Sequence, residues 1–274
     1  MYLINGQASE TLSVNDRGLH YGDGVFETLA VQNGIPLCWD RHYQRLARGC
    51  KQLQINCPLP DLLLAEIKLL VCNEPLLVLK IIITRGEGGR GYRLPEPETS
   101  VTRIVGVFPW PAYPEKNYTK GVDLKICKTR LGKNPSLAGI KHLNRLEQVL
   151  ARGEWDNPGI AEGLMLDTDD NIIEGTMSNI FILNDNELIT PDLTCCGIAG
   201  VVRECILGLA PDIGFKTRID KISESGLYSA REIFLCNSVI GLWPVTGIEG
   251  HKFTPGHGTE KIRNKLISQQ IIVQ

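Results

Sequence analysis

Hydrophobic and polar residues along this chain follow two spacings, and each spacing predicts one kind of element. Apolar runs of strand length, bounded by glycine, proline or charged residues, predict buried strands. Such runs lie at residues 2–6, 76–86, 101–108, 122–131, 164–169, 171–183, 187–191 and 232–238. The stretch FETLAVQNGIPLC, at 26–38, places Asn33 and Gly34 between two such segments, and this pair favours a tight turn. We therefore expect a β-hairpin there.

Helical spacing marks the other elements. Residues 40–55 are amphipathic, and their apolar stripe consists of Tyr43, Leu46, Ala47, Cys50 and Leu53. A second helix is expected after Pro60, and a third at Lys141, because Leu143, Leu146 and Leu150 recur at helical spacing. Further helices are expected from about Gly200 and at the C-terminus. The mixture predicts an α/β or α+β protein.

One segment interrupts both patterns. Residues 109–120 hold three prolines and few periodic positions, which is typical of a linker. We expect two domains, a smaller N-terminal α/β domain at 1–108 and a larger C-terminal domain at 121–274.

Composition narrows the class of partner. The formal net charge of −2 gives no basis for nucleic acid or an anionic membrane as the main partner. No apolar run approaches the roughly 18 residues of a membrane span, and the N-terminus has no signal-peptide pattern. The nine cysteines are irregularly spaced and contain no C-x-x-C, which favours free thiols in a reducing cytoplasm. The five scattered histidines form no metal-binding pattern, so we expect no metal site.

A glycine motif after a strand must be weighed first. Gly86, Gly88 and Gly91 match the G-x-G-x-x-G pattern of dinucleotide-binding folds. That fold needs a helix to begin at the loop, whereas the sequence continues YRLPEPETS, whose prolines disfavour one. A nicotinamide dehydrogenase is therefore disfavoured, and Arg85 and Arg90 on this loop fit the recognition of a carboxylate better.

Lys141 carries the strongest chemical indication in the chain. It follows the small apolar stretch LAGI and has no acidic neighbour in sequence. Apolar surroundings disfavour the charged form of lysine, and the resulting amine can form a Schiff base with a carbonyl substrate or with pyridoxal phosphate. The alternative is a lysine that extends its ammonium to solvent at a helix start.

Four motifs in order decide between these alternatives. LHYGDGVFET, DRHYQRL, AGIKHLNRLEQ and NIIEGTMSNIF together resemble the fold-type IV pyridoxal phosphate enzymes. That family contains branched-chain aminotransferases, D-amino acid aminotransferases and aminodeoxychorismate lyases. The resemblance extends from about Asn5 to Val245 and implies a two-domain fold, bound pyridoxal phosphate and a homodimer.

The resemblance also implies a role for individual residues. Lys141 would hold the cofactor covalently, Glu174 would pair with the pyridine nitrogen, and Arg45 would bind the phosphate. The amides of Val201 and Val202 would cap the phosphate, Ile198 would pack on the ring, and Ser238 matches a further phosphate position. Many members have threonine where this chain has Val202. Without the resemblance, Glu174 reads as an exposed strand residue, Arg45 as part of a solvated face with Arg41 and Arg48, and Ser238 as a small polar residue after a strand.

Three features favour the lyase branch of the family. Thr28 ends the F-E-T motif where the aminotransferases have glycine or an aliphatic residue, and TRGEGGRGY and KTRLGKNPSLAGIKHLNRLEQ are similar to the lyases. The implied reaction turns 4-amino-4-deoxychorismate into 4-aminobenzoate and pyruvate. Thr28 would relay a proton near the leaving group, and Arg90, assisted by Tyr92, would bind a substrate carboxylate. An aminotransferase of branched-chain or D-amino acids, and a non-catalytic cofactor-binding protein, remain the alternatives.

Overall fold

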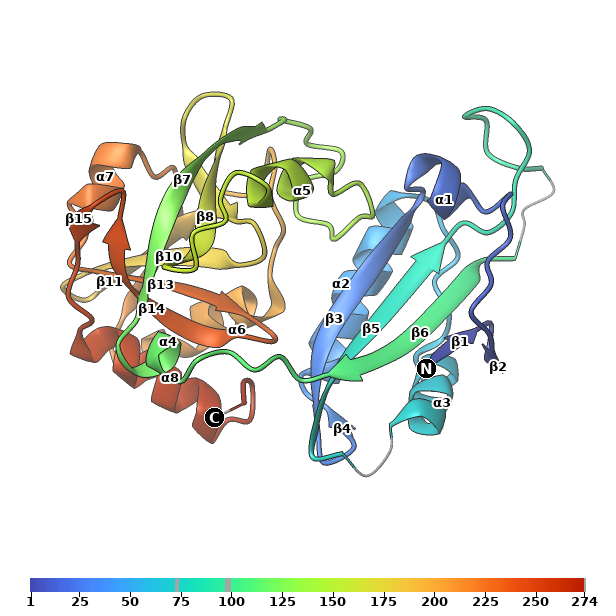
Figure 1. The fold of residues 1–274 in the computed structure, drawn as a ribbon, viewed down its shortest axis with the longest axis horizontal. Coiled ribbons are helices and arrows are strands. Elements are labelled where there is room, and N and C mark those ends of the chain that lie inside the picture. The colour runs from blue at the N-terminus through green and yellow to red at the C-terminus, as the bar shows by residue number, and fades with distance from the viewer. Residues whose placement is uncertain (72–73, 97–99, 274) are drawn as a thin grey trace. The chain divides into compact units, whose positions relative to one another are not determined.

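The computed structural model describes residues 1–71, 74–96 and 100–273 of the 274. The chain forms two compact units (Figure 1). The first comprises Met1–Pro111 with Ile140–Asn144, and the second comprises Ala112–Gly139 with Arg145–Gln274. The first unit thus contains a five-residue segment that lies well beyond its main stretch of chain.

The first unit is built on an antiparallel six-stranded sheet with the order β2-β1-β6-β5-β3-β4. Its strands are β1 (Tyr2–Ile4), β2 (Gln7–Ala8), β3 (Gly24–Gln32), β4 (Ile35–Pro36), β5 (Leu76–Thr84) and β6 (Thr102–Pro109). Asn33 and Gly34, with φ of 49° and 81°, join β3 to β4. The expected hairpin is therefore confirmed, with the left-handed backbone that this residue pair tolerates.

Helices cover one face of this sheet. They are α2 (Trp39–Gln52) and α3 (Pro60–Leu70), whereas the short α1 (Arg17–Tyr21) precedes β3. Alternate residues of β5, among them Leu79, Ile81 and Ile83, are fully buried in one core with Leu46 of α2 and Leu63 of α3. The period of two in the strand and the apolar stripe of each helix together account for this core.

The second unit contains a mixed nine-stranded sheet. Its main path is β12-β11-β10-β13-β14-β7-β8-β9, and β15 pairs with β14. The strands are β7 (Val122–Leu131), β8 (Ile160–Asp167), β9 (Ile172–Gly175), β10 (Asn179–Asn184), β11 (Glu187–Pro191), β12 (Lys216–Asp220), β13 (Glu232–Asn237), β14 (Gly241–Ile248) and β15 (His251–Lys252). The helices are α4 (Lys116–Thr119), α5 (Leu146–Arg152), α6 (Val201–Leu209), α7 (Glu224–Tyr228) and α8 (His257–Ser268), with a 3₁₀ turn at Pro211–Ile213. Apolar residues of β7, β8, β10, β13 and β14 contribute most of its main core.

The mixed α/β class expected from the sequence is confirmed. None of the helices in the described ranges combines the length and the apolar character that crossing a membrane requires. One expected element is wrong: the helix does not include Lys141 but begins five residues later, at Leu146. Residues 141–143 instead bond to a strand of the first unit, as described below.

Candidate functional site

Strand β3 presents two chemically different faces. Val25, Glu27 and Leu29 point into the core shared with α2 and α3, whereas Phe26 and Thr28 lie half-buried on the opposite face. Thr28 pairs in register with Lys80 of β5, whose ammonium lies 5.5 Å from the centre of the Phe26 ring. Thr28 is therefore not on the apolar side of its strand.

Glu27 is a carboxylate in an otherwise apolar row. Its Oε1 accepts from Arg45 Nε at 2.8 Å, and its Oε2 accepts from Arg45 Nη2 at 2.6 Å. His42 Nδ1 lies 2.6 Å from the same Oε2. Burial alone would raise the pKa of Glu27, but Arg45 and the hydrogen bond with His42 outweigh it and lower the pKa to about 2. Glu27 therefore stays ionised and holds the Arg45 guanidinium in a fixed orientation.

This cluster overturns one reading of Arg45. Only 5% of Arg45 is exposed, whereas Arg41 and Arg48 on the same helix are both exposed. Arg45 is not part of a solvated face. Burial lowers the pKa of His42, and the charges of Arg45 and Lys141 lower it further, against the opposing effect of Glu27.

Lys141 lies on an extended segment that continues the sheet beyond β3. Phe26 N donates to the Lys141 carbonyl at 2.9 Å, and Leu143 N donates to the Gly24 carbonyl at 3.0 Å. Val25 and His142 form the antiparallel bridge between these two bonds. The Lys141 ammonium lies 4.3 Å from the centre of the Phe26 ring. The sheet, and not a helix, therefore fixes the backbone of Lys141, and its side chain lies against the residue two positions before Thr28.

In the second unit, the Glu174 side chain is hydrogen-bonded to the loop before α6. Glu174 is 3% exposed, so it is not the exposed strand residue that the alternative reading required. Its Oε2 accepts from the Ile198 amide at 2.8 Å, and Asn179 Nδ2 donates to the Ile198 carbonyl at 2.9 Å. The backbone N–H and C=O of the half-buried Ile198 are thus both bound by side chains, from the successive strands β9 and β10.

The loop 197–200 leads into the N-terminus of α6. Gly139 N donates to Gly197 O at 2.9 Å, and Ala199 N donates to Gly139 O at 3.0 Å. Val201 and Val202 begin the helix and are buried, and the N-cap residue Gly200 has no side chain to cap the first amides. The first amides of a helix lack partners within the helix and favour an anion.

Ser238 lies in the turn after β13 and is half-buried. The preceding Asn237 shapes this turn, because its Oδ1 accepts from Val239 N and from Ile240 N, both at 2.7 Å. Ser238 therefore lies in a turn whose backbone is fixed by hydrogen bonds to the Asn237 side chain.

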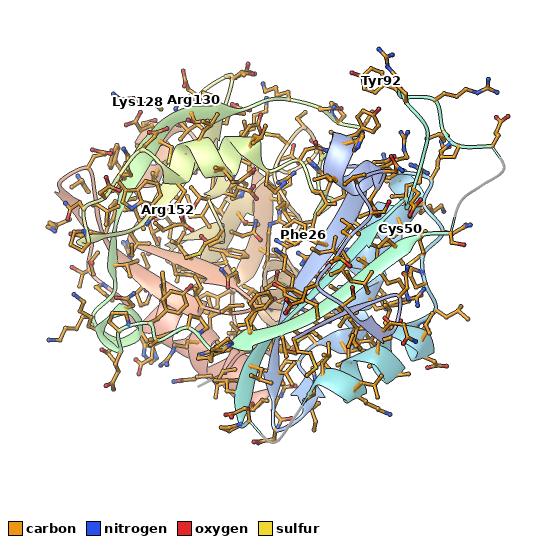
Figure 2. All side chains as sticks on the ribbon, turned by 45° about the vertical axis from the view of Figure 1, so that its right-hand side comes forward. Phe26, Cys50, Tyr92, Lys128, Arg130 and Arg152 are labelled. Atoms are coloured by element: carbon orange, nitrogen blue, oxygen red, sulfur yellow. The ribbon has the colours of Figure 1, made fainter. Side chains whose placement is uncertain are left out.

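The two arginines of the loop after β5, Arg85 and Arg90, differ in burial and in their contacts. Arg85 is 7% exposed and donates from Nε and Nη2 to Asp23, at 2.8 and 3.0 Å, so it is a structural residue and not a substrate contact. Burial raises the pKa of Asp23, but Arg85 and Arg17 outweigh it and lower that pKa. Arg90 is exposed, and Tyr92 is 85% exposed with its ring 5.4 Å from that of Tyr21. Figure 2 shows Tyr92 on the part of this loop that extends away from the strands.

The sequence did not single out Glu27, His42 or Asn179. Glu27 interrupts a row of apolar residues at alternate positions of β3, and His42 precedes Arg45 by three positions, on the same helix face. Both signals were available in the pattern. Asn179 stands in the quoted E-G-T-M-S-N motif, but the pattern alone gave it no role.

Comparison with known proteins shows the family to which the chain belongs. The model of the family described as amino-transferase class IV matches residues 24–248. An aminodeoxychorismate lyase of Vibrio harveyi is 35% identical over 97% of this chain and 99% of its own length. A putative branched-chain-amino-acid aminotransferase of Methanocaldococcus jannaschii is 28% identical over 93% of this chain and 90% of its own.

Solved structures agree with these relatives. The crystal structure of 4-amino-4-deoxychorismate lyase from Pseudomonas aeruginosa is 45% identical, with a TM-score of 0.94, and covers 99% of this chain and 100% of that one. The branched-chain amino acid aminotransferase of Escherichia coli, at 24% identity, a TM-score of 0.88 and coverage of 100% and 96%, has the same fold. The resemblance found in the four motifs is thereby confirmed, and the chain belongs to the amino-transferase class IV family.

Proposed function

We propose that this chain is a pyridoxal phosphate-dependent lyase that converts 4-amino-4-deoxychorismate to 4-aminobenzoate and pyruvate. The observation that carries the proposal is the 45% identity, over 99% of the chain, to the lyase from Pseudomonas aeruginosa. The lyase of Vibrio harveyi, at 35% identity, supports the same branch of the family.

The residues present suit the proposed cofactor. A phosphate dianion needs backbone amides and a cation, and the N-terminus of α6, whose N-cap is a glycine, and the buried Arg45 guanidinium offer these donors. We propose that Val201 and Val202 bind the phosphate through their amides, that Arg45 and Ser238 add side-chain contacts, and that Ile198 packs on the ring. Val202 has no hydroxyl, so its contribution is limited to its backbone.

Lys141 and Glu174 are proposed for the reactive end of the cofactor. Lys141 would hold it covalently through its ε-amino group and, once released, would take the proton from C4 of the substrate. Glu174, fixed by the Ile198 amide, would pair with the pyridine nitrogen and keep it protonated. When bound, pyridoxal phosphate supplies a ring that takes up the electrons of the bond broken at C4.

Thr28 is proposed as the residue specific to elimination. It lies on the face of β3 that carries Phe26, and the Lys141 ammonium lies against that Phe26 ring. A hydroxyl there would relay a proton near the enolpyruvyl oxygen as it leaves. Arg90 and Tyr92, both exposed on their loop, are proposed to bind a substrate carboxylate.

A direct assay tests the function. Purified protein loaded with pyridoxal phosphate is mixed with 4-amino-4-deoxychorismate, and the fluorescence of 4-aminobenzoate is followed without any keto acid. Product formation in this mixture supports the lyase. Turnover of branched-chain or D-amino acids that requires a keto acid, without product from aminodeoxychorismate, would instead support an aminotransferase, which the relatives at 26–28% identity keep as the second candidate.

We further propose a cytoplasmic homodimer with neither nucleic acid nor a membrane as a partner. The net charge of −2 supports the absence of nucleic-acid and membrane partners, the free thiols of the eight described cysteines support the compartment, and the family resemblance implies the dimer. Light scattering coupled to gel filtration would measure the mass, and a mass of about one chain would contradict the dimer.

A further inference from the structure

Strand β8 carries a buried carboxylate to which neither the fold nor the proposed reaction gives a role. Glu162 is 1% exposed, and the four residues that follow it on the strand are apolar and buried. Its bonding partners in the described chain are hydrogen-bond donors and not cations. Burial raises the pKa of Glu162, and the hydrogen bonds it accepts oppose that rise only in part. A carboxylate this costly to bury calls for a structural reason.

The donors to Glu162 come almost entirely from one turn. Oε1 accepts from Thr176 N at 3.2 Å, from Thr176 Oγ1 at 2.5 Å and from its neighbour Gly163 N at 2.9 Å. Oε2 accepts from Met177 N at 3.1 Å and from Ser178 Oγ at 3.0 Å. A single side chain therefore fixes all three residues of the turn between β9 and β10.

This turn directly follows Glu174. A Cβ added to Gly175 would come within 2.9 Å of Glu162 Oε2 and would also meet Ser178 Oγ, so a larger residue there would have to displace one of these two side chains. Gly175 N also donates to Ser178 O at 2.7 Å. The strand end that carries Glu174 thus cannot move without disturbing the bonds to Glu162.

The same network continues to the turn that carries Ser238. The Met177 carbonyl accepts from Asn237 Nδ2 at 2.9 Å, and Asn237 Oδ1 in turn accepts from the amides of Val239 and Ile240. A continuous chain of hydrogen bonds therefore joins Glu162 to two turns, one beside Glu174 and one around Ser238.

We propose that Glu162 is a positioning residue that sets the relative placement of Glu174 and Ser238, and thereby the pairing with the cofactor's ring nitrogen and the grip on its phosphate. The proposal rests on the function proposed above. Glu162 would not contact the ring nitrogen or the phosphate of the cofactor. It acts through the turn residues Thr176, Met177 and Ser178.

The test compares wild type with Glu162→Gln and with Glu154→Gln as a matched control. Glutamine keeps the shape of Glu162, but its NH₂ would face donors that now point at a carboxylate oxygen. Glu154 is a suitable control because it also accepts from backbone amides, those of Lys128 and Thr129 at 2.7 and 2.8 Å, in the same unit. The network described here does not include it.

Two measurements do not depend on turnover. The first is the affinity of the apoprotein for pyridoxal phosphate, followed by fluorescence, which we expect Glu162→Gln to weaken about 10-fold or more, the equivalent of about 1.4 kcal/mol. The second is the pH midpoint of the visible absorption of the bound cofactor, which we expect to shift because it reports the pairing between Glu174 and the ring nitrogen. Glu154→Gln should match wild type in both.

Unchanged affinity and an unchanged midpoint in Glu162→Gln, or equal changes in both glutamine variants, would overturn the inference. If Glu162→Gln does not fold, Thr176→Val removes one hydroxyl donor and leaves the backbone of the turn intact; a wild-type midpoint and affinity in that variant would then overturn it. A wild-type protein that binds no pyridoxal phosphate would overturn the proposed function and this inference together, whereas wild-type binding with an unaltered Glu162→Gln would overturn the inference alone.

Discussion

Replacing Glu27 by glutamine should show how much the buried ion pair between Glu27 and Arg45 contributes to the free energy of unfolding. In the folded protein the pKa of Glu27 is about 2, against an ordinary value of 4.5. At about 1.4 kcal/mol for each pKa unit, this difference of about 2.5 corresponds to roughly 3–4 kcal/mol of stability at neutral pH. Removing one partner of a buried pair costs a similar amount, about 3–5 kcal/mol, because the Arg45 charge stays buried.

The contribution of Glu27 to stability should also depend on pH, in a direction that its pKa shift determines. The folded-state pKa is the lower one, so the stabilisation is complete above pH 4.5 and is lost as the pH falls towards 2. The free energy of unfolding of wild type should therefore fall by about 1.4 kcal/mol for each pH unit over that window through Glu27 alone. Glu27→Gln should lack this part of the pH dependence. Urea unfolding of the apoprotein at several pH values between 3 and 7 would measure both slopes.

Glu10→Gln, at an exposed position, serves as the control and should follow wild type. If Glu27→Gln differs from wild type by less than about 1 kcal/mol at pH 7, or has the same slope below pH 4.5, the ion pair does not contribute as reasoned.

Four further predictions concern the proposed chemistry. Borohydride reduction followed by peptide mapping should place the pyridoxyl group on Lys141, and label on another lysine would refute that assignment. Arg45→Ala should weaken cofactor affinity by about 1.5–3 kcal/mol, the scale of a charge-assisted hydrogen bond, which dialysis followed by absorption would measure; full retention contradicts the phosphate role. Thr28→Val should lower lyase turnover by about 10²–10⁴-fold while half-transamination of amino acids falls much less; equal losses would argue against proton relay. Val202→Thr should tighten cofactor binding by about 0.5–1.5 kcal/mol through one added hydroxyl contact, and unchanged affinity would mean that the hydroxyl does not reach the phosphate.

Local patterns predicted most of the elements. The hairpin at Asn33–Gly34, the amphipathic α2 and the helix after Pro60 follow from turn chemistry and periodicity, which a short window of sequence contains. The short α1 and the strands β12 and β14 were not anticipated. Their segments are short, or interrupted by polar residues and glycine. Helix α1 depends on its caps at Asp16 and Gly22, and the two strands depend on pairing within the sheet.

The surroundings of the candidate residues were less accessible to sequence reasoning. Helical spacing after Lys141 is real, but two backbone bonds to Gly24 and Phe26, more than a hundred residues earlier, override it in residues 141–143. The burial of Arg45 depends on Glu27, which lies on another element. Such non-local pairings leave no periodic trace. The roles of Lys141, Glu174 and the other site residues stay predictions.

The segment at 140–144 has a consequence for the order in which the protein is made. Lys141 and Leu143 satisfy the backbone of Phe26 and Gly24, so the edge of β3 lacks this pairing until residue 144 has been synthesised. The main stretch of the first unit ends at Pro111, which leaves 144 − 111 = 33 further residues. At about 5–20 residues per second, the nascent chain exposes this strand edge for roughly 2 to 7 s. An unpaired edge is a template for association with other chains. The segment that presents Lys141 is therefore also the piece that closes this strand edge during translation.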